Sequence, residues 1–360
     1  MFIDSAELKI KGPDKKTEAL YQKKFRLNEF IFENIIRSVS FVSFAVIILI
    51  FVFVFREAVP IFISSEKNNI KKEEVKMETY GDDSQTSQNT SLQQAPSKSV
   101  EDASSNDKAT IKNLAGKVWQ PVSEEPKYGL LPLFMGSFKV TLLAILFGGP
   151  IAVLAALFTA TLAPKKLKEY IKPVIELLAG FPSVVIGFFA LIAIASAMQS
   201  VFGYQYRLNA FVGAIALSLA VIPIIYTVAD DALTSIPKHL TEASLALGAT
   251  KWQTSLFVIL PAATPGIFAA FLLGLGRAFG ETMIVLMATG NASMLSFGIF
   301  EPVRTMSATI GAEMAEVVFG DTHYNVLFLI GSILFIFTFV LNAVAEFWVR
   351  NRLIKKFRGA

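Results

Sequence analysis

The stretch Ala262–Asn291 reads AATPGIFAAFLLGLGRAFGETMIVLMATGN, and its only charged residues are Arg277 and Glu281. It is long enough to cross a bilayer, which takes about 20 apolar residues in a helix. Each charge costs roughly 2.5–3.5 kcal/mol at the centre of a membrane helix. Residues four apart on a helix share one face, so the two side chains are predicted to lie together. A charged pair kept at this cost predicts a partner, a cavity or a path for a polar solute.

Other apolar runs accompany this stretch, and together they predict a polytopic all-α membrane protein with six transmembrane helices. The chain has 360 residues, of which 53% are hydrophobic, and this is too apolar for a typical soluble protein. Backbone polar groups in lipid must be satisfied within each segment, so the spans are expected to be helices packed in a bundle. The predicted spans are Ile35–Phe55, Phe138–Ala163, Pro173–Ala197, Ala210–Ala229, Ala262–Asn291 and Val326–Val349.

Lysine and arginine in the short loops predict the orientation of the bundle. Four lysines crowd residues 164–172, and five basic residues follow position 349. Because basic loops stay on the cytoplasmic side, both segments are predicted to be cytoplasmic. Six spans then place the N-terminus and the loop 231–261 on the same side. The first apolar run follows a long charged tail without a small-residue cleavage pattern, so no cleavable signal peptide is expected.

The predicted organisation follows from these spans. It comprises a cytoplasmic tail 1–34, a first transmembrane helix 35–56, an outer segment 57–132, a transmembrane region 133–350 and a cytoplasmic tail 351–360. The middle of the outer segment, residues 82–106, is rich in Ser, Gln, Asn and Asp. Such a composition cannot bury enough surface to offset chain entropy, so this part is predicted to be disordered. A spacer is the simplest interpretation, and a docking role for its flanks stays open.

The residues that are missing exclude several classes of function. The chain has no cysteine and two histidines, which argues against a disulfide framework and against a histidine-based metal site. It has no GxxxxGK[ST] phosphate-binding loop and no nucleophile–base arrangement. The chain is therefore predicted to be neither an enzyme nor a nucleotide hydrolase, and no nucleic acid partner is expected.

The loop 231–261 is too patterned for a simple connector. A short helix is predicted to begin at Thr241–Glu242, Gly248 to permit a turn, and Pro261 to open the next helix, where its missing N–H is harmless. The residues around Glu242 are small, and small residues let a helix sit deep in a groove of another protein. The alternative is an amphipathic helix that lies on the membrane surface.

The pattern Glu242-Ala243-Ser244-x3-Gly248-x9-Val258-x-Leu260-Pro261 resembles the EAA loop of bacterial ABC importer permeases. Two departures are mild, a Ser for the second Ala and a Val for the usual Ile. The resemblance implies a type I ABC importer permease fold and a coupling helix that docks on a cytoplasmic ATPase. It assigns this coupling to Glu242, Ala243, Ser244, Gly248, Leu260 and Pro261.

Further segments resemble phosphate permeases. Lys172–Val185 is similar to their third-span signature, and Gly276–Met283 with Gly290-Asn291 to their fifth span. The methionine-rich run Thr282–Met287 is similar to PstC-type subunits, whereas PstA-type subunits tend to have Ala-Pro after the Glu-Thr pair. The resemblance covers about Gly129 to Trp348. Pro302-Val303-Arg304-Thr305 and His323-Tyr324 fit the outer loop of the same family.

This resemblance implies a transport subunit for inorganic phosphate in a bacterial inner membrane, surrounded by lipid, with Arg277 and Glu281 on the substrate path. It implies a PstA-type permease partner, a PstB-type ATPase dimer that binds ATP and Mg, and a PstS-type phosphate-binding protein. A sensor-kinase system is a further implied partner, and no cofactor is expected in this chain.

Several alternatives stay open. The substrate is phosphate or another oxyanion such as sulfate or molybdate, and a membrane signalling component that kept the permease fold is a different class. The Arg277–Glu281 pair has a purely structural alternative, an ion pair that locks its helix to a neighbour. Arg304 is expected to be a surface charge, with a role in facing arriving anion as the alternative.

Overall fold

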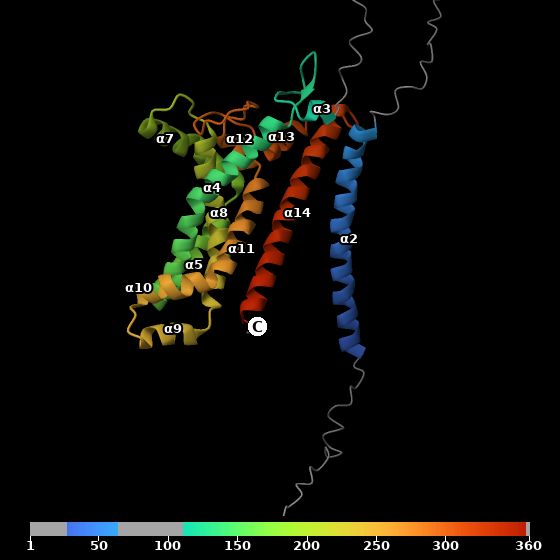
Figure 1. Cartoon of the computed structure of the whole chain (residues 1–360). Coiled ribbons are helices and arrows are strands. Elements are labelled where there is room, and N and C mark those ends of the chain that lie inside the picture. Colours follow the sequence, from blue (N-terminus) through green and yellow to red (C-terminus); the bar gives the residue numbers. More distant parts are fainter. Residues whose placement is uncertain (1–26, 64–110, 358–360) are drawn as a thin grey trace, which may run out of the picture. The chain divides into compact units, whose positions relative to one another are not determined.

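The computed structural model describes residues 27–63 and 111–357 (Figure 1). Helices make up almost all of it, and one antiparallel hairpin pairs Trp119 with Tyr128. The elements are α2 (Leu27–Ile63), α3 (Ile111–Leu114), β1 (Trp119–Gln120), β2 (Lys127–Tyr128), α4 (Leu131–Leu157), the π-helix η1 (Phe158–Leu162), α5 (Lys165–Ala179), α6 (Ser183–Phe189), the π-helix η2 (Ala190–Ile194), α7 (Ala195–Phe202), α8 (Ala210–Thr234), α9 (Lys238–Ala246), α10 (Lys251–Thr254), the π-helix η3 (Ser255–Ile259), α11 (Leu260–Phe279), α12 (Met283–Ala288), α13 (Met306–Glu313) and α14 (Thr322–Phe357).

Within the described ranges, six helices are long and apolar enough to cross a membrane, which confirms the predicted six-span bundle. A helical segment of this length and composition keeps its backbone hydrogen bonds internal and can therefore sit in lipid. The spans are Ile31–Phe62, Leu131–Leu162, Ser183–Phe202, Ala210–Thr234, Lys251–Phe279 and Thr322–Val344.

The chain divides into two units, Met1–Phe53 and Val54–Ala360. The described part of the first unit is the beginning of α2, whose apolar side chains are exposed on every side from Ile31 to Phe53. A helix that is apolar all round suits a lipid environment. The predicted disorder of residues 82–106 lies outside the described residues.

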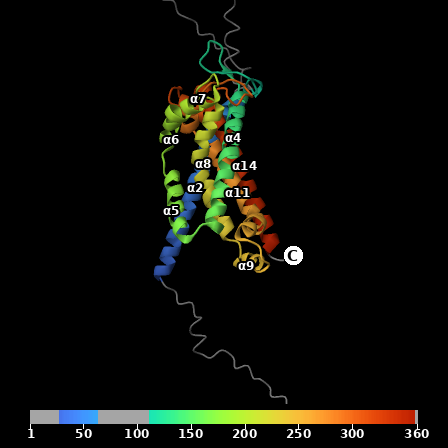
Figure 2. The ribbon, with the colours of Figure 1, turned by 90° about the vertical axis from the view of Figure 1, so that its left-hand side faces the viewer.

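The core of the second unit forms where α8 packs between α4 and α11, and α11 in turn lies beside α14 (Figure 2). Small residues allow these close approaches, because lipid gives helices little reason to associate other than tight packing. Ala144 and Ala152 of α4 are fully buried. A Cβ at Gly266 of α11 would lie 2.4 Å from the Cβ of Ala232 on α8.

The third span differs from the predicted Pro173–Ala197. The helix breaks at residues 180–182, so α5 is a separate helix without fully buried residues and the span is Ser183–Phe202. Proline explains the break, because Pro182 lacks an N–H to donate and pushes the preceding residue out of the helical region. Pro182 itself has φ −58° and ψ 136° and stands just before α6.

Helix ends also differ from the predicted boundaries. The helix α2 extends from Leu27 to Ile63, beyond the predicted 35–56 on both sides. At the other terminus, α14 continues to Phe357 and passes the predicted boundary at 350. Within the second unit, α9 and α10 lie at one end, and α3, α12 and α13 lie at the opposite end (Figure 1).

Candidate functional site

Arg277 and Glu281 form an ion pair, with 2.9 Å between Arg277 Nη1 and Glu281 Oε2. Glu281 is buried, with 4% of its side chain exposed, whereas half of the Arg277 side chain is exposed. The carboxylate is therefore held inside the second unit, and half of the side chain of its arginine partner stays accessible from outside this chain.

The predicted unbroken helix through Asn291 is wrong. The helix α11 ends at Phe279, and α12 begins only at Met283. Gly280 favours the end of the helix because it has the lowest helix propensity after proline. The Ser307 hydroxyl donates a hydrogen bond of 2.6 Å to the Glu281 carbonyl, so this backbone group is satisfied without a helix. Arg277 thus stands in the last turn of α11, and Glu281 lies in the break.

A neighbouring helix comes close to this pair. A Cβ at Gly276 would lie 3.2 Å from Oδ1 of Asn342 on α14. Glycine at this position therefore lets the polar side chain of α14 approach α11 within one residue of Arg277.

The EAA-like loop forms two short helices, and the first begins at Lys238 rather than at the predicted Thr241–Glu242. The helix α9 has no buried residue, and Glu242 and Ala243 are exposed on it. Ser244 lies within hydrogen-bonding distance of Thr254 on α10, at 2.9 Å between the hydroxyl oxygens. This contact ties the first helix to the second.

Gly248 makes the turn between α9 and α10, as predicted. Its φ is +86°, which L side chains rarely adopt, and a Cβ there would meet nothing within 4 Å. Backbone geometry, not space, thus favours glycine. Leu247 beside it is 90% exposed and Trp252 is 55% exposed. The turn at Gly248 therefore lies between two exposed apolar side chains.

The two predicted sets of residues are connected by one helix. Leu260 and Pro261 stand at the start of α11, and Arg277 stands in its last turn. Arg277 stands sixteen positions after Pro261, which is a rise of about 24 Å along a helix at 1.5 Å per residue. The structure thus brings Glu242, Ala243, Ser244 and Gly248 together and keeps the Arg277–Glu281 pair apart from them.

At the opposite end from α9 lies a charged cluster whose contacts were not predicted, although two of its members, Arg304 and His323, belong to the predicted outer-loop segments. Glu313 contacts Arg304, accepts a hydrogen bond of 3.1 Å from Trp119 Nε1 and lies 2.9 Å from His323 Nε2. The Arg304 side chain is 19% exposed, so the expectation of a surface charge is wrong. Burial raises the pKa of the Glu313 carboxyl, but His323, Trp119 and Arg304 together outweigh it and hold this pKa below its usual value. We call these four residues the Glu313 cluster.

A second missed contact links Lys172 of α5 to Asp230 of α8, with 2.6 Å between Nζ and Oδ2. The hydrogen bond to Asp230 raises the pKa of Lys172. Since 58 residues separate the two partners, no local pattern could have revealed this pair. It fastens the half-exposed lysine of α5 to the core helix α8.

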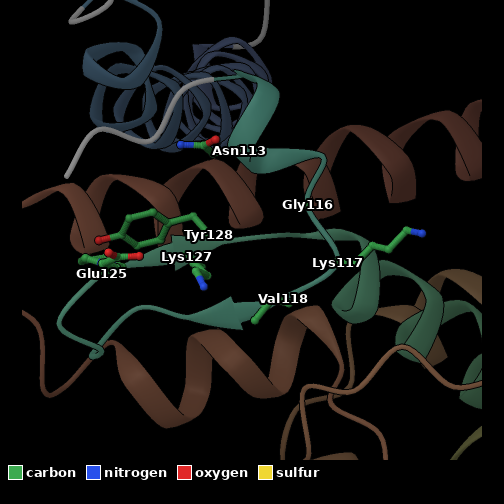
Figure 3. A pocket seen from close by; sticks show the side chains of 8 residues that line it. Asn113, Gly116, Lys117, Val118, Glu125, Lys127 and Tyr128 are labelled. Atoms are coloured by element: carbon green, nitrogen blue, oxygen red, sulfur yellow. The ribbon is translucent and has the colours of Figure 1, made fainter. Parts of the chain in front are cut away.

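A hollow of about 330 Å³ lies beside the hairpin, where Lys117, Glu125 and Lys127 extend along its rim (Figure 3). Neither Arg277 nor Glu281 lines it. Among the described residues, no group of three or more His, Asp or Glu side chains is arranged to hold a metal ion.

Comparison with known proteins identifies the family. Residues 148–354 match the family described as the binding-protein-dependent transport system inner membrane component. The chain belongs to this family. A probable ABC transporter permease protein of Bacillus subtilis, YqgH, is 37% identical over 67% of this chain and 78% of its own length. The phosphate transport system permease protein PstC of Mesorhizobium japonicum is 33% identical over 65% of this chain and 76% of its own length.

These relatives confirm the predicted PstC-type ABC permease family, and with it the role of a multi-pass permease subunit of an ABC importer. Among solved structures, a chain of the inward-facing MetNI methionine ABC transporter has a TM-score of 0.45 and 20% identity. That match covers 62% of this chain and 94% of the transporter chain.

Proposed function

We propose that this chain is the permease subunit of an ATP-driven importer for inorganic phosphate. The observation that carries the proposal is the half-exposed side chain of Arg277, paired with the buried Glu281 in a chain that belongs to a family of importer permeases. A guanidinium keeps its charge and matches phosphate oxygens with its planar fork. Curated relatives named as phosphate transport permeases support the same substrate.

Glu281 would keep the affinity of Arg277 for the transported anion low. The Glu281 carboxylate pairs with Arg277 at 2.9 Å. An arriving phosphate competes with Glu281 for the guanidinium, and the carboxylate recovers it after the anion leaves. Transport requires binding that is weak enough for release, and competition with Glu281 would weaken the binding of phosphate to Arg277. The substrate itself is not chemically changed.

The proposed coupling begins at α9. Glu242, Ala243, Ser244 and Gly248 would contact a separate ATPase subunit, with the corner at Leu247 and Trp252 exposed beside them. The helical span Lys251–Phe279 is continuous from α10 to Arg277. A displacement of α9 and α10 would therefore travel past Leu260 and Pro261 to Arg277 along one rigid segment.

The proposed assembly contains a PstA-type permease, two PstB-type ATPase copies that bind ATP and Mg, and a PstS-type binding protein. In this assembly the α9 end and both termini face the cytoplasm. The lysines of residues 164–172 support that orientation. A regulatory link to a sensor kinase belongs to the same proposal.

Uptake of radiolabelled phosphate tests the substrate. The chain and its partner subunits are expressed in a strain that lacks its own phosphate permease, and unlabelled sulfate or molybdate is added in excess. We expect uptake that neither competitor reduces. Uptake suppressed by sulfate or molybdate would assign another oxyanion, and intact signalling without uptake would assign the signalling role.

A further inference from the structure

A cavity of about 370 Å³ lies between α9 and the rest of the second unit, away from the Arg277–Glu281 pair. Lys238, Thr241 and Leu245 of α9 line it. Their spacing of three and four residues marks one face of a helix. Lys238 and Leu245 are exposed on this face, and Glu242, four residues after Lys238, lies next to it without lining the cavity. The remaining walls come from α8 and its following loop, α10, and the π-helices η1 and η3.

The charged side chains that line this cavity are two lysines, Lys238 and Lys251, and no carboxylate lines it. Within the part of the chain that the structure describes, neither ammonium group has an ion-pair or hydrogen-bond partner, and the Thr241 hydroxyl has no hydrogen-bond partner either. Other hydroxyls of the wall are engaged, since Ser255 donates to Thr161 at 2.9 Å. Two ammonium groups and the Thr241 hydroxyl thus line one cavity in which no carboxylate faces them.

We propose that this cavity binds a phosphate group. A tetrahedral oxyanion offers several acceptor oxygens at once and is held best by charged donors. Its negative charge would also complement the positive charge of the two lysines that line the cavity. The group comes either from free inorganic phosphate or from the headgroup of an anionic lipid, because both present the same oxygens.

A bound phosphate group would join α9 to α10, since Lys238 and Thr241 belong to the first helix and Lys251 to the second. It would stiffen the segment that we propose to move during transport. This consequence depends on the proposed function, whereas the binding itself depends only on the cavity.

The test measures equilibrium binding of radiolabelled inorganic phosphate to the full chain in detergent. All samples carry Arg277→Gln, so that the proposed path site does not contribute. The double variant Lys238→Gln/Lys251→Gln is compared with Lys165→Gln/Lys166→Gln, which removes two exposed lysines outside the cavity. In a second arm, native mass spectrometry counts phosphatidylglycerol retained from nanodiscs. Thr241→Val removes the third donor without a change of charge.

We expect the cavity variant to lose phosphate binding, or the retained anionic lipid, while the control variant keeps it. Each lysine should contribute roughly tenfold in affinity, the scale of one charge-assisted hydrogen bond. Loss in the first arm identifies free phosphate, and loss in the second identifies a lipid headgroup. Equal binding by both double variants in both arms overturns the proposal. If Arg277→Gln still imports phosphate, the proposed path fails while this test keeps its meaning.

Discussion

At the scale of single residues, Glu313 connects segments that lie far apart along the chain. Its carboxylate contacts Arg304, His323 at the start of α14 and Trp119 of the hairpin, 194 residues away. Glu313 and its two charged or titratable partners, Arg304 and His323, are mostly buried, with 10–19% of their side chains exposed. Because these side chains are mostly buried, the loss of any one of them should destabilise the fold. A buried charge without its partner is energetically costly.

Glu313→Gln should destabilise the protein by about 3 kcal/mol, because Arg304 would stay buried without its counter-charge. Thermal unfolding of the purified chain in detergent measures the change. Glu313 and Glu316 both line a groove of about 820 Å³. Glu316→Gln is the matched control, since Glu316 is exposed, and this substitution should be neutral. Equal stabilities for the two variants would mean that the Glu313 cluster does not contribute to the free energy of unfolding.

The same carboxylate predicts a dependence on pH. The pKa of Glu313 is lower in the folded protein than its usual value of about 4.3. The ionised form thus stabilises the fold fully above that usual value, and the contribution is lost as the pH falls through the lowered folded pKa. Trp119 fluorescence, read in a Trp252→Phe/Trp348→Phe background, should report loosening below about pH 4. Glu313→Gln should lack this transition. An unchanged transition in that variant would mean that a group other than Glu313 causes it.

At the scale of helices, the sequence predicts which segments cross the membrane but not where they break. The residues on both sides of Glu281 are mostly apolar as far as Met287. Hydropathy alone therefore predicts one continuous helix. The break depends on Gly280 and on the Ser307 hydroxyl, which is 26 residues from the Glu281 carbonyl that it satisfies. Pro182 offered a local signal for the other break, yet proline also occurs inside α8 at Pro223 without ending that helix.

Close packing of α8 on α11 predicts that Gly266→Ala is destabilising. The new Cβ would lie 2.4 Å from the Cβ of Ala232, which has no flexible end to move aside. Overpacking of this kind typically costs about 1–3 kcal/mol. Gly331→Ala in α14 is the control, because its Cβ would meet its nearest neighbours at 3.9 Å. Urea or thermal unfolding of both variants checks the prediction, and similar stabilities would contradict the packing.

The turn at Gly248 predicts graded effects on binding of the ATPase subunit. Gly248→Leu would strain the positive φ of +86° and should shift α9 relative to α10. Gly248→Asn should be tolerated better, because Asn adopts the left-handed region more readily than other side chains. Co-purification of the ATPase and coupled hydrolysis are the measurements. Full binding and coupling by the leucine variant would remove α9 from the docking surface.

At the scale of the whole molecule, the predicted features are local in the sequence, whereas the missed features join residues that are far apart along the chain. The six spans correspond to continuous apolar runs, which the sequence shows directly. Arg277 and Glu281 are four residues apart, so their pairing could be predicted as well. The Glu313 cluster and the Lys172–Asp230 pair join residues from different elements, and the latter is 58 residues apart. Such contacts depend on how the helices pack, which a single sequence does not specify.

The central claim is that Arg277 handles the transported anion. The most direct test compares phosphate uptake by cells that carry wild type or Arg277→Gln together with the partner subunits. Arg207→Gln is the control, because Arg207 is an exposed arginine of the connection before α8. The account predicts that Arg277→Gln loses uptake at unchanged membrane abundance while Arg207→Gln retains it. Normal phosphate uptake by Arg277→Gln would contradict the account.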